Sequence, residues 1–132
     1  MNTSTTTTAA QTFTFTGRLR SVAHALSGIR LMLRSQHNAW VHAAVTVAVV
    51  ATSFILELSR AEWCAIVIAI ASVWTAEALN TAFEFLCDVA SPEFHPAVKN
   101  AKDVAAGAVL ITAVGAAVVG LLVFLPRLVA LA

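Results

Sequence analysis

Long apolar stretches separated by short polar ones dominate this chain. Three of them, at about 40–57, 63–88 and 104–125, consist mostly of hydrophobic residues. A helix rises 1.5 Å per residue, and about 17–25 apolar residues are enough to cross the hydrocarbon of a bilayer. We therefore predict three transmembrane helices joined by short loops.

A different pattern occupies residues 16–37, where apolar residues recur at helical spacing and polar residues gather on the opposite side. The apolar positions are Leu19, Val22, Leu26, Ile29 and Leu33, and the polar ones are Arg20, His24, Ser27, Arg30 and Arg34. This pattern predicts an amphipathic helix that lies in the membrane surface with its basic side toward anionic headgroups. The arginines either anchor the helix only, or one or two of them also contact a phosphate.

Composition supports a small integral membrane protein. The 132 residues are 59% hydrophobic and 11% charged, whereas a soluble domain is about half apolar and a quarter charged. Residues 1–15 are rich in threonine and lack an apolar core segment, which predicts a disordered tail and no cleavable signal peptide. The remainder, 16–132, is expected to form a single all-α membrane domain. Cys64 and Cys87 stand apart without a CxxC motif and are expected to be unreactive thiols.

The distribution of positive charge predicts the orientation of the helices. Six of the eight basic residues lie in the N-terminal region and the second loop, namely Arg18, Arg20, Arg30, Arg34, Lys99 and Lys102. The other two, Arg60 and Arg127, lie on the opposite side of the predicted bilayer. Since basic residues accumulate on the cytoplasmic side, the N-terminus and the second loop are expected to be cytoplasmic.

The second predicted span carries a polar stripe formed by Glu77, Asn80, Glu84 and Asp88. Their spacings of three, four and four residues place them within an arc of roughly 80° on one helix face. A carboxylate at the centre of a membrane helix costs about 2.5–3.5 kcal/mol on insertion scales, so several on one face indicate function. Such acids bind a cation, accept a proton or handle a phosphate.

Lys102 and Asp103 come just before the third span, close to the end of the acidic stripe. They form either a solvated charge pair or a site where Lys102 contacts a phosphate and Asp103 holds a ribose, a cation or a base. The chain has no GxxxxGK[ST] loop and no kinase HRD or DFG motif. Phosphoryl transfer mainly requires positioning, a divalent cation and an acceptor base, which a carboxylate stripe and a lysine can supply. Nothing in the sequence points to nucleic-acid binding.

These residues resemble the signature of the prokaryotic diacylglycerol kinase family, whose members are small trimeric membrane kinases with a surface helix and three membrane helices. The family pattern E-x-x-N-(S/T)-A-x-E-x-x-x-D is met from Glu77 to Asp88. The A-K-D motif is met at 101–103, and the G-(I/L)-(K/R) motif of the surface helix is met at 28–30. The resemblance extends from about Gly17 to Leu125. It implies a multi-pass protein of the bacterial cytoplasmic membrane that uses ATP and Mg²⁺, and it implies a homotrimer whose active sites are shared between subunits.

The resemblance also implies roles for individual residues. Glu77 would be the general base that takes the proton from the lipid hydroxyl, and Glu84 would bind the magnesium carried by ATP. Asn80 would orient the carboxylates, Lys102 would contact the ATP phosphates, and Asp103 would support nucleotide binding. The substrate and ATP site as a whole would include Arg30, Gln36, Asn80, Glu84, Asp88, Lys102 and Asp103.

One position departs from the family pattern. Family members usually carry a second metal-binding glutamate at the end of the surface helix, and here that position holds Gln36. Glutamine keeps a carbonyl oxygen but has no charge, whereas magnesium prefers carboxylate and phosphate oxygens. We therefore expect Gln36 and Glu84 to bind magnesium more weakly than a pair of glutamates, and an impaired enzyme is the more radical interpretation.

The family contains enzymes that phosphorylate diacylglycerol and enzymes that phosphorylate undecaprenol. Asn38, His42 and the loop beginning at Ser91 resemble the undecaprenol kinase branch more closely. Undecaprenol is therefore the expected acceptor, with diacylglycerol as the alternative. Two further classes stay open at this point: a small proton-coupled transporter that uses an intramembrane glutamate, and a scaffold protein in which the polar stripe only joins helices.

Overall fold

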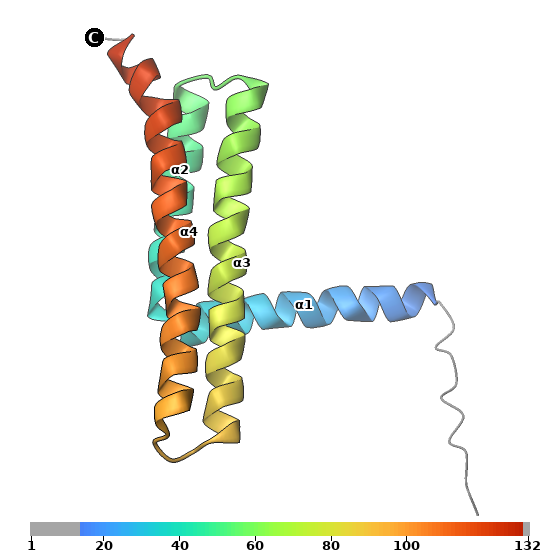
Figure 1. Cartoon of the computed structure of the whole chain (residues 1–132). Coiled ribbons are helices and arrows are strands. Elements are labelled where there is room, and N and C mark those ends of the chain that lie inside the picture. Colours follow the sequence, from blue (N-terminus) through green and yellow to red (C-terminus); the bar gives the residue numbers. More distant parts are fainter. Residues whose placement is uncertain (1–13, 131–132) are drawn as a thin grey trace, which may run out of the picture.

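The computed structural model describes residues 14–130, which fold into four helices. They are α1 (Phe15–Ser35), α2 (His37–Ile55), α3 (Arg60–Ala90) and α4 (Pro96–Val129). Helices α2, α3 and α4 run side by side, and α1 projects across them (Figure 1). The three side-by-side helices are each long and apolar enough to cross a membrane. The predicted all-α fold with an N-terminal helix and three spans is therefore confirmed.

The chain turns at Gln36, between α1 and α2. Gln36 has an extended backbone (φ −110°, ψ 119°), so the first helix ends at Ser35 and the second starts at His37. The surface helix predicted at 16–37 is thus shorter at its C-terminal end. It starts one residue earlier because Thr14 caps it by accepting a hydrogen bond from the Gly17 N–H. Residues 1–13 of the predicted tail lie outside the described residues.

Helices α3 and α4 are longer than the spans predicted at 63–88 and 104–125. Ser59 and Glu62 form a capping box at the start of α3, and Pro96 occupies the first turn of α4. The 31 residues of α3 extend about 46 Å, compared with about 28 Å for the 19 residues of α2. Figure 1 shows that the hairpin between α3 and α4 continues past the level of α1. The polar end of the stripe lies in this extension.

Packing within the chain is uneven. The most extensive contact is between α3 and α4, whereas α2 makes only a few contacts with α3, spread along its length. Trp74 links the two by donating from Nε1 to Thr46 Oγ1 at 3.1 Å. At the end remote from α1, the Arg127 guanidinium binds the Glu62 carboxylate and the Leu56 carbonyl oxygen. Large apolar side chains point outward on every helix, as expected for surfaces that face lipid or a neighbouring subunit.

Candidate active site

The polar stripe of α3 passes from the protein interior to the surface. Glu77 is 1% exposed and Asn80 is also buried, whereas Glu84 is half-buried and Asp88 is exposed. On the same face, Ile66, Ile70 and Val73 precede Glu77 and line an apolar cavity. One helix face therefore changes from apolar to acidic at Glu77 and reaches water at Asp88.

Glu77 has no hydrogen-bond partner for its carboxylate among the described residues. Both Oε1 and Oε2 are buried and unpaired, and the Oδ1 atom of Asn80 is unpaired as well. The Nε2 atom of His42 lies 3.8 Å from Glu77 Oε2, which is too long for a hydrogen bond. A buried polar group without a partner costs about 1–3 kcal/mol. Three such atoms in one place mark a site where a polar group of a substrate can bind.

Two neutral amides hold the Glu84 carboxylate. Gln36 Nε2 donates to Oε2 at 2.6 Å, and Asn80 Nδ2 donates to Oε1 at 3.0 Å. The extended backbone of Gln36, which turns the chain between α1 and α2, also brings this amide to α3. The structure therefore brings together three of the predicted site residues, which come from two separate parts of the chain.

These residues fit a magnesium ion that arrives with a nucleotide. Residues 14–130 contain no cluster of three His, Cys, Asp or Glu side chains able to hold a metal alone. Magnesium is usually held by one or two carboxylates together with substrate phosphates, so a single carboxylate at Glu84 is sufficient on the protein side. Gln36 would contribute its carbonyl oxygen only after its amide had turned away from Glu84.

Lys102 and Asp103 form separate pairs. Lys102 Nζ bonds to Asp88 Oδ1 across the α3–α4 hairpin, and Lys99 Nζ bonds to Asp103 Oδ2 within α4. The alternative of a Lys102–Asp103 pair is therefore wrong, because Lys102 faces α3 instead. Lys102 and Asp88 lie at the aqueous end of the stripe. Arg30 is exposed on α1, and within residues 14–130 it has no hydrogen bond or ion pair, so the structure does not join it to the stripe.

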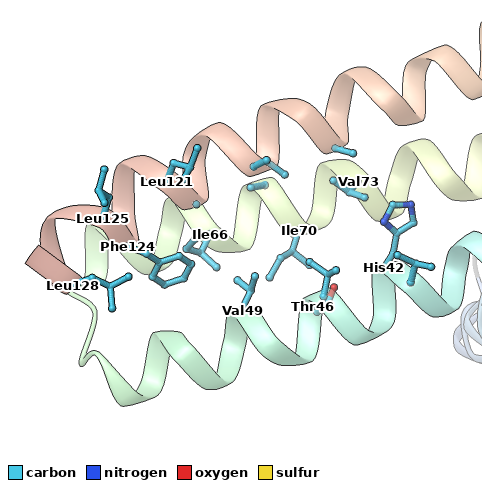
Figure 2. A pocket seen from close by; sticks show the side chains of 17 residues that line it. His42, Thr46, Val49, Ile66, Ile70, Val73, Leu121, Phe124, Leu125 and Leu128 are labelled. Atoms are coloured by element: carbon cyan, nitrogen blue, oxygen red, sulfur yellow. The ribbon is translucent and has the colours of Figure 1, made fainter.

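An elongated cavity of about 690 Å³ lies between α2, α3 and α4. Its lining is almost entirely apolar, with His42 at one end and Leu125 and Leu128 at the other (Figure 2). His42 was expected only to mark one family branch, and its place beside Glu77 was not predicted. The available signal was that His42 is the one ionisable residue between Asn38 and Ile55.

Comparison with known proteins now identifies the family. Residues 23–124 match the family described as "Prokaryotic diacylglycerol kinase". The chain belongs to this family. It is 43% identical over 109 residues to a protein of Bacillus subtilis named undecaprenol kinase. These aligned residues cover 83% of this chain and 89% of the relative. It is 34% identical over 114 residues to a protein of Synechocystis named diacylglycerol kinase, covering 86% of this chain and 65% of the relative.

Membership of this family confirms that the chain is an enzyme, a membrane lipid kinase. The transporter and scaffold alternatives are thereby set aside. The polar stripe of α3, which begins at Glu77, lies within the matched residues. Glu77, Asn80, Glu84 and Gln36 are thus the candidate catalytic group of this kinase.

Proposed function

We propose that this kinase transfers the γ-phosphate of ATP to the hydroxyl of undecaprenol, giving undecaprenyl phosphate and ADP. The observation that carries the proposal is the buried, unpaired carboxylate of Glu77, which lies between an apolar cavity and a polar region that reaches water. The higher identity to the Bacillus subtilis undecaprenol kinase supports this acceptor. Diacylglycerol is the second candidate, favoured by the family description and by the Synechocystis relative.

The apolar face of α3 supports a lipid acceptor. A lipid chain that lies along Ile66, Ile70 and Val73 would carry its polar end one helical turn further, to Glu77. His42 lies at that end of the cavity, and the remaining lining is apolar apart from Thr46 (Figure 2). The hydroxyl would thus be the one polar group of the acceptor that finds polar partners in the protein.

Glu77 acts as the general base in this mechanism. Its carboxylate accepts the proton of the acceptor O–H, and the oxygen forms a bond to the γ-phosphorus of ATP. The bond between that phosphorus and the β,γ-bridging oxygen breaks, and its electrons leave with ADP. Asn80 keeps Glu84 oriented through its 3.0 Å hydrogen bond. Bound at Glu84 and Gln36, magnesium would neutralise charge on the phosphate oxygens.

The nucleotide approaches from the aqueous end of the stripe. Asp88 holds the Lys102 ammonium at this end, which supports a contact between Lys102 and a phosphate. Asp103 supports nucleotide binding from the next position of α4. Arg30 would contact a phosphate or a lipid headgroup from α1, where it is exposed. The positive charge near the N-terminus and the second loop supports a cytoplasmic location for this end, in a bacterial cytoplasmic membrane.

A homotrimer is part of the proposal. No residue in the apolar window of α4 is buried within one chain, and helix α2 makes only a few contacts with α3. Neighbouring subunits would cover these surfaces and complete sites that are shared between chains.

The test is a phosphate-transfer assay with radiolabelled ATP and purified protein in mixed micelles, with undecaprenol and diacylglycerol offered separately. We expect label in undecaprenol. Glu77→Gln should lower turnover by about 10²–10⁴-fold, the usual contribution of a general base, while ATP binding is retained. Label in diacylglycerol alone would show that diacylglycerol, and not undecaprenol, is the acceptor. Label in neither lipid, or an unchanged rate for Glu77→Gln, would contradict the proposed function or the role of Glu77.

A further inference from the structure

We infer that His42 binds the acceptor hydroxyl, donating a hydrogen bond from Nε2 to the same oxygen that Glu77 deprotonates. This inference deepens the proposed function and rests on it, because it takes Glu77 as the base. It adds a residue of α2 to a site that the sequence placed on α3, α4 and the end of α1.

The distance between His42 and Glu77 would allow one oxygen atom to bind to both side chains at the same time. Nε2 of His42 and Oε2 of Glu77 are 3.8 Å apart, so they do not satisfy each other. An oxygen placed about 2.8 Å from both atoms would form the third corner of a triangle, at ordinary hydrogen-bond distances. With the proton on Nε2, His42 donates to this oxygen while the hydroxyl donates to Glu77. The hydrogen bonds to His42 and Glu77 then fix the direction of the remaining lone pair of the oxygen.

The imidazole is held by its surroundings. Its ring packs edge-on against Trp74, with ring centroids 6.4 Å apart and an interplanar angle of 65°. Trp74 is fixed in turn by its hydrogen bond to Thr46, one turn after His42 on α2. Because Trp74 and Glu77 are three residues apart on α3, the same short segment positions both the base and the histidine. A group held in this way orients a substrate at a low entropic cost.

His42 is also one of the two polar side chains that line the cavity. Only His42 and Thr46 among the lining residues carry a polar side-chain atom, and Thr46 already accepts from Trp74. His42 makes no hydrogen bond within residues 14–130, and its side chain is 17% exposed. A lipid alcohol in the cavity would therefore meet two polar side chains, and His42 is the one that lies next to the carboxylate.

Substitutions that separate donation from packing test the inference. His42→Leu keeps the bulk without a donor, His42→Gln places an amide N–H near the position of Nε2, and His42→Asn holds an amide that is too short. We expect Leu and Asn to lower kcat/KM for the lipid alcohol by about tenfold or more, while Gln restores most of it and the KM for ATP stays unchanged. The same Leu and Gln changes at the exposed His24 of α1 serve as the matched control.

The outcomes distinguish this inference from the proposed function. If the Leu variant equals or exceeds the Gln variant, His42 only packs, and the inference is wrong while the lipid kinase assignment stands. A raised KM for ATP with an unchanged lipid response would move His42 to the nucleotide side and also overturn it. If wild-type protein phosphorylates neither lipid, both proposals fail. Should the Leu variant fail to fold, as judged by thermal unfolding in micelles, the contrast between Gln and Asn decides.

Discussion

Replacing Gln36 with glutamate should make the kinase depend more strongly on magnesium and bind it more tightly. In the structure, the Gln36 amide donates to Glu84 at 2.6 Å and so occupies the oxygen that a metal would need. In Gln36→Glu this bond is lost, and two carboxylates face each other at the end of α1. Magnesium would then join the two groups, whereas in the wild type it must first displace an amide.

The magnitude follows from the two interactions that change. A hydrogen bond to a charged group contributes about 1.5–3 kcal/mol. Two like charges about 4 Å apart repel by about 1 kcal/mol in water and about 4 kcal/mol at an effective dielectric constant of 20, and Glu84 is half-buried. In Gln36→Glu, binding the metal relieves this repulsion and no longer breaks the hydrogen bond, and the two effects together amount to at least about 2.5 kcal/mol. Since about 1.4 kcal/mol corresponds to a factor of ten, the half-saturating magnesium concentration should fall at least tenfold.

Two assays check this prediction. Magnesium titration of phosphate transfer gives the half-saturating concentration, and thermal unfolding with and without magnesium gives a readout that does not depend on turnover. Gln36→Glu should unfold at a lower temperature than wild type without the metal and gain more from its addition. Gln36→Leu, which removes the bond without adding charge, separates the two contributions. Equal half-saturation in wild type and Gln36→Glu would refute the assignment of Gln36 to the metal site.

Two further predictions concern the ends of the α3–α4 pair. Lys102→Ala should raise the KM for ATP by about tenfold and change the KM for lipid little, because it would remove the proposed phosphate contact of an ammonium that Asp88 holds. Arg60→Ala, at the opposite end, is the control, and an equal effect would assign the change to net charge. Arg127→Leu should lower the unfolding temperature by several degrees, since Arg127 joins α4 to Glu62 and to the α2–α3 loop. An unchanged unfolding temperature would show that this ion pair contributes no stability.

The periodicity of the sequence was sufficient to predict the helices and the face that carries the stripe. A hydrophobic stretch long enough to cross the bilayer must satisfy its backbone internally, so length and composition fix the helical state. Spacings of three and four residues then place Asn80 beside Glu84, and the structure has these two side chains bonded. The predicted roles of these residues in catalysis remain to be tested by the assays above.

Contacts between helices were beyond the reach of periodicity. The pairing of Gln36 with Glu84 spans 48 residues, and that of Lys102 with Asp88 spans 14. Both depend on the rotation and depth of one helix relative to another, which the pattern of a single helix leaves undetermined. The same reason explains why His42 was not placed beside Glu77.

The turn at Gln36 fixes both where α1 meets the helix bundle and which side chain binds Glu84. The residue ends α1 and begins the membrane crossing of α2, and its side chain binds Glu84. Glu84 therefore stays close to the end of α1, and Glu77 lies about 10 Å away along α3, toward the apolar cavity. A lipid whose hydroxyl reaches Glu77 can keep its chain in the apolar cavity, and a nucleotide that reaches Glu84 can stay in water. Changing Gln36 should thus alter both metal binding and the packing of α1 against α3. Magnesium half-saturation and thermal unfolding, measured on the same Gln36 variants, report these two effects.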